Sequence, residues 1–540
     1  MRSRNAIANS EHSRISETAA VLLLLCLWSA GWTWFIYSHG WLAWYGDAEA
    51  HLNIARRILD SRTPGYDQIG TVWLPLLHVL LLPLAHNDEL WRTALAGSIV
   101  SGAAFVLAGT FLFFAARRVF PGRAPAMVML VVFAGNPNLL YLQSTAMTEP
   151  LFIAASMAVL YFTVRFRDTQ SWPSLFGASL AATCGTLCRY DGWFLIPFSA
   201  LFILLAARKQ RIVKAGVFSL VACLGPAYWL AHNWWCCASV LAFYSGPGSA
   251  KAIQGAATYP GYGNWGKALL FFFTAARWCA GGPLFWLGAA GLAASAAVPK
   301  ARWPAVYLLL PAVFYIWSIH SAGTPIFMPD LWPNSYYNTR YGLALLPGLA
   351  LGATVLASLC PERAHLAAAW AAALLAVAPW LIRPHPEAWI TWKESQVNSE
   401  SRRAWTRAAA DYLAPRYRRG SGIITTFGDI TGIYRRMGLP LRETLTWDNW
   451  PLWPAAVARP DLFLWEEWAV VIGGDPVQTA LWRAGAHGPR YELAKTIIVP
   501  GAPAVEIYHC CIGLTPLNHD DNSLHQVPWS QERLPPDEDQ

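Results

Sequence analysis

The sequence predicts a polytopic α-helical membrane protein with about 11–13 transmembrane helices and a small external α/β domain at its C-terminal end. Of the 540 residues, 55% are hydrophobic and only 13% are charged, whereas about a quarter of a soluble domain is charged. The chain also holds 30 Trp, a residue that membrane proteins place at the interfaces. The net charge of +8 does not indicate nucleic-acid binding, because the basic residues are scattered through short loops.

Apolar runs of nearly spanning length define the helical part, since a helix needs about 20 residues to cross the hydrocarbon core. The first run, 18–38, is too long for the core of a signal peptide, so we expect an uncleaved span after a cytoplasmic N-terminus, 1–17. Further spans are expected at 93–116, 124–142, 150–164, 174–188, 192–207, 214–231, 281–298, 303–319, 341–359 and 364–382.

The segment 72–86 decides the predicted topology. It is apolar but short, and it contains Pro75 and Pro83. If it does not cross the membrane, all the basic clusters fall on the cytoplasmic side, as the positive-inside rule requires; if it crosses, every cluster after the first changes side. We therefore expect it not to cross, which places the C-terminus outside. The clusters are Arg2/Arg4/Arg14, Arg117/Arg118/Arg123, Arg165/Arg167, Arg208/Lys209/Arg211/Lys214, Lys300/Arg302 and Arg363.

Two regions outside the spans have their own character. The loop 39–92 is expected to be external and to carry helices that lie in the membrane interface. Beyond 382 the composition becomes that of a globular domain, so 383–515 is expected to be an external, periplasmic α/β domain. Strand-like runs in it lie at 422–427, 468–473, 495–500 and 504–509. The polar tail 516–540 is expected to be disordered.

The first candidate site begins at Asp47, in the loop after the first span. Gly46 allows a turn, and Asp47 then presents a carboxylate at the N-terminus of an amphipathic helix. His51 follows one turn later on the same side, and Glu49 and Arg56 lie on the polar face of that helix. A capped surface helix would show the same pattern, so the residues alone leave both interpretations open.

Two further sites lie where external loops meet spans. Glu149, before Pro150, stands at the start of one span; acids at membrane depth are costly and often functional, although an acid there also stabilises the helix dipole. Arg189-Tyr190-Asp191 is squeezed between two spans. Arg189 and Asp191 can pair with each other, but that use does not require them to lie so close to Glu149.

A fourth site is Asn338-Thr339-Arg340-Tyr341, at the external mouth of the span 341–359. An Arg there suits an anionic head group, because its guanidinium binds phosphate in a fork; a snorkelling interfacial Arg is the alternative. Taken together, a carboxylate can serve as general base, and Arg can stabilise the charge on a departing phosphate. The set predicts group transfer from a lipid-phosphate donor.

These motifs carry a family resemblance. Over about 18–345 the chain resembles the GT-C superfamily of membrane glycosyltransferases, and within it the protein O-mannosyltransferase group (glycosyltransferase family 39) and the lipid A aminoarabinose transferase group. The resemblance implies that 18–382 is the transmembrane catalytic domain of a hexosyltransferase of the inner or plasma membrane. It rests on Gly46-Asp47, Trp73-Leu74-Pro75-Leu76-Leu77-His78, Met147-Thr148-Glu149-Pro150 and Arg189-Tyr190-Asp191-Gly192-Trp193.

The resemblance also implies roles. The donor would be a polyprenyl-phosphate sugar, and the acceptor a protein, lipid or glycan at the non-cytoplasmic face, with inversion at the anomeric carbon. Asp47 would be the catalytic base and Glu149 the second acid, with Arg189 and Arg340 as candidates for the phosphate. The other residues expected to bind substrate are Glu49, His51, Arg56, His78, Tyr190, Asp191, Asn338 and Tyr341.

The chain departs from the family pattern in two places. Ala48 stands where many members carry a second acid, and Trp73-Leu74-Pro75-Leu76 replaces the Lys-Pro-Pro-Leu of the lipid A enzyme, so a Lys for the phosphate is missing. The mannosyltransferase branch works without a metal, and we assign no metal ligands. A divalent cation stays an open alternative, because Asp47, Glu49, His51 and Glu149 have suitable ligand atoms.

Two other functions are alternatives to transfer. A transporter or flippase of a lipid-linked or anionic substrate would need charges near the bilayer midplane and broken helices in related halves. The sequence shows neither an internal repeat nor acids in the middle of a span. A non-catalytic scaffold that displays the external domain leaves the ordering of Asp47, Glu149 and Arg189 unexplained.

Overall fold

The computed structural model describes residues 2–512 except 256, 322 and 427, so the expected tail 516–540 lies outside the described residues. The chain forms two compact units. The helical unit comprises Met1–Arg416, Phe427–Glu443 and Val499–Ala502, and the sheet unit comprises Tyr417–Thr426, Thr444–Ile498 and Pro503–Gln540. The boundary expected at 383 falls inside the helical unit, because helix α20 (Ile390–Leu413) packs against other helices of that unit.

The helical unit has the composition of a membrane domain. Among the described residues, seven helical segments are long and apolar enough to cross a membrane, or eight if one bent pair counts as a span. The polytopic helical fold is thus confirmed. The elements of the seven are α1 (Arg2–Ser38, apolar from Ser16), α5 (Leu95–Val119), α8 (Thr148–Thr169), α11 (Arg211–Ala222) with α12 (Leu224–Cys237), α17 (Arg302–Ser321), the 3-10 helix η3 (Thr339–Leu345) with α18 (Leu346–Leu359), and α19 (His365–Ile382).

The count is lower than the expected 11–13 because several expected spans are helices of fewer than about 17 residues, the lower end of the range for a full crossing. Helices α6 (Ala124–Ala134), α9 (Trp172–Thr186) and α10 (Asp191–Ala206) have 11, 15 and 16 residues. The bent pair is α15 (Trp265–Ala280) and α16 (Gly282–Ala294, continued by η2, Ser295–Ala297), which meet at 116°. Gly281 joins them with φ +85°, a conformation that glycine adopts without steric cost.

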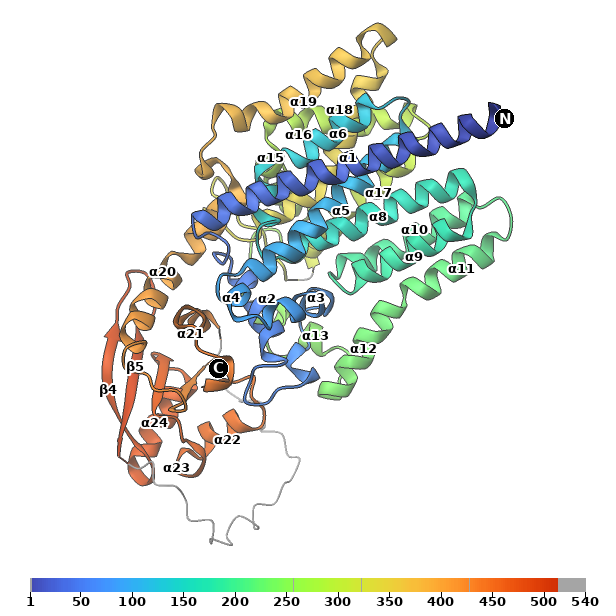
Figure 1. Ribbon diagram of the computed structural model, residues 1–540. Helices are drawn as coiled ribbons and strands as arrows, with labels where there is room; N and C mark the ends of the chain where they lie inside the picture. Colours follow the sequence, from blue (N-terminus) through green and yellow to red (C-terminus); the bar gives the residue numbers. More distant parts are fainter. Residues whose placement is uncertain (1, 256, 322, 427, 513–540) are drawn as a thin grey trace. The chain divides into compact units, whose positions relative to one another are not determined.

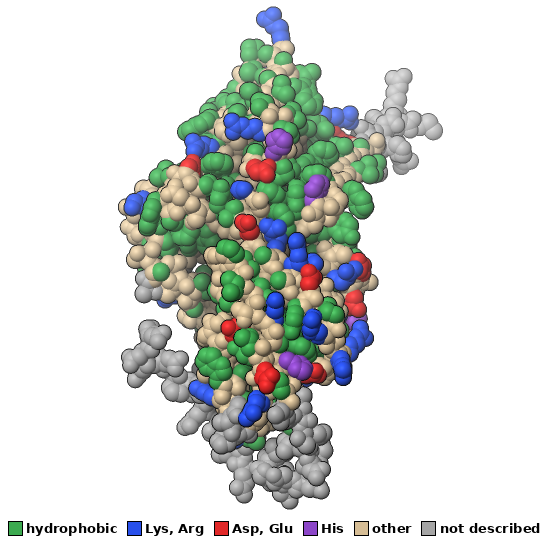
Figure 2. All heavy atoms as spheres, turned by 90° about the vertical axis from the view of Figure 1, so that its left-hand side faces the viewer, with side chains coloured by type: hydrophobic (Ala, Val, Ile, Leu, Met, Phe, Trp, Pro, Cys, Tyr) green, Lys and Arg blue, Asp and Glu red, His purple; other side chains and the backbone are tan. Residues whose placement is uncertain are grey.

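The exterior of the helical bundle is apolar. Leu23, Leu27 and Trp34 of α1 and Trp370 and Leu374 of α19 are exposed. Figure 2 shows hydrophobic side chains over most of the upper part of one face, with few charged side chains among them. A soluble protein rarely exposes a contiguous apolar surface of this kind, so these helices face lipid.

Helices α2 (Gly46–Arg57), α3 (Leu76–Ala85) and α4 (Asp88–Arg92) lie together at one end of the bundle (Figure 1). Helix α3 has 10 residues, so it is about 15 Å long, half of the ~30 Å hydrocarbon core. Helix α2 differs from the expected interfacial helix because both its apolar and its polar face are buried.

The remaining short elements are η1 (Tyr66–Ile69), α7 (Pro137–Leu142), α13 (Ala242–Ser245), α14 (Ala250–Gln254), η4 (Glu362–Ala364), η5 (Pro386–Ala388), η6 (Asp429–Thr431), α21 (Gly432–Met437) and η7 (Leu441–Glu443).

Loops with basic residues lie at the end of the bundle where helices α5 and α8 finish. At the C-terminal ends of α5 and α8, Arg118 pairs with Asp168 at 3.3 Å, and Arg167 donates to the carbonyl of Lys300 at 3.1 Å. Gln170, which follows α8, donates to the carbonyl of Ala206 at the end of α10. Four of the basic clusters predicted for the cytoplasm therefore border one surface, those around Arg118, Arg167, Arg208 and Lys300.

The sheet unit holds a five-stranded mixed sheet in the order β2-β1-β3-β5-β4. Strand β1 is parallel to β2 and β3, whereas β5 is antiparallel to β3 and β4. The expected run 495–500 is instead the end of β4, an edge strand whose mostly exposed, charged residues hid it from a hydrophobicity pattern. The elements are β1 (Ile423–Thr425), β2 (Thr444–Leu445), α22 (Leu452–Ala458), α23 (Pro460–Phe463), β3 (Trp468–Ile472), α24 (Pro476–His487), β4 (Arg490–Ile497) and β5 (Val505–Ile512).

Candidate active site

Asp47 lies in the first turn of α2, one residue after Gly46 begins the helix. Its carboxylate accepts a hydrogen bond from Nη2 of Arg340 at 2.6 Å. The helix N-cap is Tyr45, whose side chain makes no capping hydrogen bond. Asp47 therefore does not cap a surface helix. Its carboxylate faces the guanidinium of Arg340, which lies 293 residues away in sequence.

Arg340 is the centre of the cluster, because its guanidinium binds three carboxylates. Besides Asp47, it contacts Glu149 through Nε at 3.0 Å and Glu394 through Nη1 at 2.7 Å. Its turn, η3, lies directly on α15: a Cβ added to Gly342 would be 2.4 Å from the carbonyl carbon of Ala275. The glycine thus permits the close approach that sets the position of Arg340, whose side chain is only 8% exposed.

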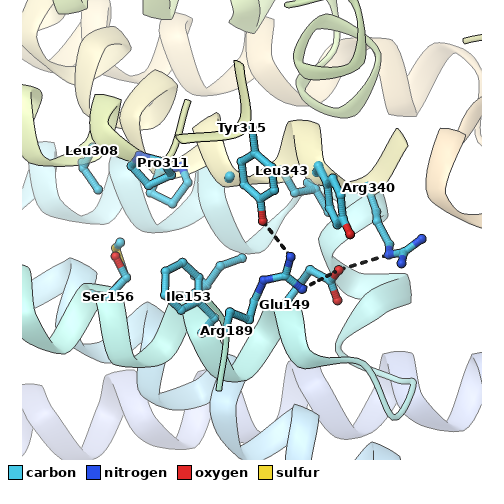
Figure 3. A pocket seen from close by; sticks show the side chains of 14 residues that line it. Glu149, Ile153, Ser156, Arg189, Leu308, Pro311, Tyr315, Arg340 and Leu343 are labelled. Atoms are coloured by element: carbon cyan, nitrogen blue, oxygen red, sulfur yellow. Dashed lines mark hydrogen bonds and ion pairs between the residues drawn. The ribbon is translucent and has the colours of Figure 1, made fainter. Parts of the chain in front are cut away.

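Glu149, in the first turn of α8, joins Arg340 to Arg189. One of its oxygens accepts from both guanidinium groups, at 3.0 and 3.2 Å. Arg189 also pairs with Asp191 at 3.3 Å and donates to the hydroxyl of Tyr315 at 2.9 Å. Tyr315 in turn donates to Asp191 at 3.1 Å. Each of these buried groups therefore has a partner of opposite charge within contact distance, as buried charges require, and Figure 3 shows part of this chain of contacts.

Aromatic rings line the two guanidinium groups. The ring of Tyr341 lies 5.2 Å from the guanidinium carbon of Arg189 and 5.3 Å from that of Arg340. Tyr315 stacks on Tyr341, and Tyr45 lies 5.1 Å from Arg340. These distances are within the range of cation–π attraction, which holds the cations in place without adding negative charge.

A cavity opens beside this cluster, between α8, α17 and α18 (Figure 3). The space between its lining atoms is about 440 Å³, open solvent at its mouth included. One end is charged and aromatic, with Glu149, Arg189, Arg340 and Tyr341. The rest is mainly apolar, and is lined by Phe152, Ile153, Ser156, Met157, Leu308, Pro311, Tyr315, Leu343, Ala344 and Pro347.

Glu49 and Arg56, which were expected to bind substrate, have structural partners instead. Glu49 pairs with Arg402 of α20 at 3.1 Å and with Arg435 of α21 at 2.9 Å. Arg56 pairs with Asp60 at 2.7 Å and donates to the carbonyls of residues 85 and 86 at the end of α3. Both side chains are buried, so they fix α2 against its neighbours rather than facing the cavity.

Three more predicted residues have their side-chain partners outside the cluster. Tyr190 donates to the carbonyl of Val72 at 2.7 Å and accepts from Trp229 at 3.0 Å. The backbone N–H of Asn338 donates to Glu394 at 3.1 Å. His78 lies on α3 and is joined to His51 at 2.9 Å between ring nitrogens. Of the predicted set, the structure thus brings together Asp47, Glu149, Arg189, Asp191, Arg340 and Tyr341.

Burial keeps the histidine pair neutral. It lowers the pKa of His51 to about 4, although Asp47 and Glu149 oppose this shift, and Arg340 and Arg189 add to it. Burial also places the pKa of His78 well below its ordinary value, helped by His51. Between roughly pH 6.5 and pH 4 the unfolded chain therefore binds more protons than the folded one, so the free energy of unfolding falls as the pH is lowered through this window.

We expect a measurable acid sensitivity from this pair. Lowering the pH to about 5 should destabilise the protein by about 2 kcal/mol through His51 alone. The double variant His51→Gln/His78→Gln should show a flatter dependence of the thermal unfolding temperature on pH than the wild type, measured in detergent. The exposed His385→Gln is the matched control. Equal steepness in the double variant and the wild type would refute this assignment.

Four residues of the site and its surroundings carried no predicted role: Tyr315, Glu394, Arg402 and Arg435. Tyr315 was hidden because it is one polar hydroxyl inside an apolar span. Glu394 and Arg402 belong to a segment whose composition resembles a soluble helix. The signal that could have found Glu394 is its place in Trp389-Ile390-Thr391-Trp392-Lys393-Glu394, an acid in an aromatic-rich run directly after the last span.

Asp47, Glu49, His51 and Glu149, which have suitable ligand atoms for a divalent cation, do not form a common metal site. Glu49 is held by two arginines away from the cavity, and Glu149 is held by two others. Within the described part of the chain, no three His, Cys, Asp or Glu side chains are arranged to hold a metal ion.

Comparison with known proteins supports the resemblance. Residues 80–235 match the family model described as dolichyl-phosphate-mannose-protein mannosyltransferase. No curated protein matches the chain. Among solved structures, the chain is similar to ArnT from Cupriavidus metallidurans bound to undecaprenyl phosphate, with 14% identity and a TM-score of 0.55. The apo state of the same protein gives 14% identity and a TM-score of 0.51.

The similarity extends over nearly the whole of both proteins, covering 92% of this chain and 98% of ArnT in each comparison. At this identity it shows a shared fold, which includes both the helical part and the C-terminal mixed sheet. The family match adds the class of chemistry over 80–235. The resemblance predicted from the motifs is therefore confirmed: the chain is a multi-pass membrane protein with the fold of ArnT, and its residues 80–235 match the dolichyl-phosphate-mannose-protein mannosyltransferase model.

Proposed function

We propose that this chain is a glycosyltransferase of the GT-C type that moves a sugar from a polyprenyl-phosphate donor to an acceptor at the non-cytoplasmic face, with inversion at the anomeric carbon. The cavity that ends at Arg189 and Arg340 carries the proposal. Its apolar part suits a prenyl chain, and its two guanidinium groups suit a phosphate. A protein of similar fold, ArnT, has been solved with undecaprenyl phosphate bound, which supports a donor of this class.

Asp47 is the proposed general base. Its side chain is 43% exposed, whereas Glu149, Asp191 and Glu394 are buried, so an acceptor can reach Asp47 and none of the other three. Asp47 takes the proton from the acceptor hydroxyl or amine while that atom bonds to the anomeric carbon. The bond between that carbon and the phosphate oxygen breaks, and the polyprenyl phosphate leaves as an anion that Arg340 and Arg189 stabilise.

Glu149 acts through the two arginines. It lies between them, at 3.0 and 3.2 Å, and prevents two buried cations from repelling each other in the absence of a phosphate. A buried carboxylate held by two guanidinium groups stays ionised, so it is unsuited to donate a proton. Its role as the second acid of the site is thus to position the cations.

The arrangement of the helix ends supports an external site. Helix α8 has 22 residues, which is about 33 Å and enough to cross the hydrocarbon core. Glu149 lies at its start, and the basic residues Arg165 and Arg167 lie near its end. Since basic loops stay in the cytoplasm, the cluster around Arg340 belongs on the other side.

A labelling experiment tests this topology. A cysteine introduced as Pro121→Cys, in the exposed loop after Arg118, should react with a membrane-impermeant maleimide only after cells are permeabilised. Asp67→Cys, in the exposed part of the loop 39–92, should react in intact cells. Mass spectrometry of the labelled peptides separates these thiols from the native ones. Labelling of residue 121 in intact cells would refute the external site.

The transfer reaction itself is tested by mass spectrometry of the cell envelope. Lipids, glycans and exported proteins are compared between cells with and without the gene, and the acceptor is the fraction that loses a hexose-type mass. Accumulation of the polyprenyl-phosphate sugar should accompany that loss. If the donor instead collects at the cytoplasmic face and no acceptor changes mass, a flippase explains the result and the transfer proposal fails.

A further inference from the structure

Glu394 holds both Arg340 and the residues directly before it. One carboxylate oxygen accepts from the backbone N–H of Asn338 at 3.1 Å and from Nη1 of Arg340 at 2.7 Å. The other accepts from the backbone N–H of Thr339 at 2.7 Å and from its hydroxyl. With a side-chain exposure of 2%, Glu394 is fully buried, and it does not line the cavity.

The three partners of the Arg340 guanidinium are not equivalent. Nε and Nη1 are bound to Glu149 and Glu394, whose side chains are 7% and 2% exposed. Nη2 is bound to Asp47, the one partner with access to solvent. A phosphate that enters the cavity can therefore replace Asp47 at Nη2 while the other two contacts hold the plane of the guanidinium in place. That exchange also frees the base for the acceptor.

Charge gives Glu394 a second effect. Four carboxylic side chains, those of Asp47, Glu149, Asp191 and Glu394, face only two guanidinium groups, those of Arg189 and Arg340, so acidic groups are in excess. An anionic phosphate is repelled by that excess, because like charges in a site of low dielectric constant destabilise each other. Glu394 contributes to the repulsion from behind Arg340, without contacting the cavity.

We propose that Glu394 is a positioning residue for the donor: it fixes Arg340 so that only Nη2 exchanges partners, and its charge limits how tightly the lipid phosphate is held. This inference rests on the proposed function, since it assigns Arg340 to the phosphate. It predicts that removing the charge of Glu394 strengthens binding of the lipid phosphate. A variant without this charge should then release the polyprenyl phosphate product more slowly.

Binding of undecaprenyl phosphate to the full-length protein in nanodiscs tests the inference. Glu394→Gln keeps the shape but removes the charge, and should bind about tenfold more tightly than the wild type. Glu394→Asp keeps the charge and should bind within about threefold of the wild type. Glu400→Gln, an exposed glutamate on the same helix, is the matched control and should not change the affinity.

A role in packing alone predicts the opposite order, in which the isosteric Gln binds like the wild type and the shorter Asp binds more weakly. Either of those results overturns the inference. A gain of affinity cannot come from a misfolded variant, and if Glu394→Gln does not fold, the Asp variant still separates the two roles. If Arg340→Lys binds the lipid phosphate as well as the wild type does, Arg340 does not hold the phosphate and this inference fails. The proposed function fails separately, if the wild type itself binds no undecaprenyl phosphate.

Discussion

Replacing Asp47 with Asn should lower the rate of sugar transfer by about 10²–10⁴-fold, the range by which a general base contributes to catalysis. The Asn side chain has nearly the same shape and can still accept the hydrogen bond from Arg340, so the helix and the cluster should stay in place. It cannot take a proton from the acceptor. Initial rates of transfer from a labelled polyprenyl-phosphate sugar, with the acceptor fraction found by mass spectrometry, measure the effect.

Asp67→Asn is the matched control for this substitution. Asp67 belongs to the same loop, is exposed at the start of the 3-10 helix η1, and has no place in the cluster around Arg340. Its variant should retain the wild-type rate, and both variants should insert into the membrane and unfold at the wild-type temperature. Full transfer activity in Asp47→Asn would remove Asp47 as the base and leave the acceptor to be activated by another group.

Replacing Arg340 should have the second large effect, and two substitutions separate its two roles. Arg340→Ala leaves the buried Glu149 and Glu394 without a shared cation, which should cost about 3–5 kcal/mol of stability. Arg340→Lys keeps the charge but cannot present three nitrogens in a plane, so it should fold and bind the lipid phosphate at least about tenfold more weakly. Donor binding should suffer more than acceptor binding.

The measurement combines thermal unfolding with titration of undecaprenyl phosphate. Arg277→Ala is the control, since its side chain is 45% exposed and its ion pair with Asp330 spans 3.5 Å. Exposed pairs of this kind contribute at most about 1 kcal/mol. An unchanged donor titration in Arg340→Lys would show that Arg340 does not bind the phosphate, and would leave Arg189 as the residue that does.

The helical fold could be predicted from the sequence because lipid imposes a simple rule on each span: a long run of apolar residues. The same rule failed at α6, since the apolar run of the expected span 124–142 continues through a turn into α7. Pro75 and Pro83 together with the basic clusters were enough to predict that 72–86 does not span the membrane. The 10 residues of α3 are consistent with that prediction.

The centre of the site was predictable for a different reason. Asp47, Glu149, Arg189 and Arg340 stand where helices begin, and charged residues are rare at such positions in an apolar chain. Which of them pair with one another depends on how the helices pack, and this does not follow from their spacing. Glu49 and Arg56 illustrate the limit: they share a face of α2 with residues that could bind substrate, but their partners lie on α4, α20 and α21.

The path of the chain through the two units has a consequence for engineering. The helical unit is discontinuous in sequence: the chain leaves this unit after Arg416 and returns to it from 427 to 443. The returning segment contains Arg435, which pairs with Glu49, and Leu441, whose backbone N–H donates to Asp60. A chimaera or truncation cut after the last span, near 383, would separate Arg340 from Glu394. It would also separate Glu49 of α2 from its partners Arg402 and Arg435. Exchange of the sheet unit between relatives therefore needs junctions near 417, 427 and 443, so that the donor site keeps its own C-terminal helices.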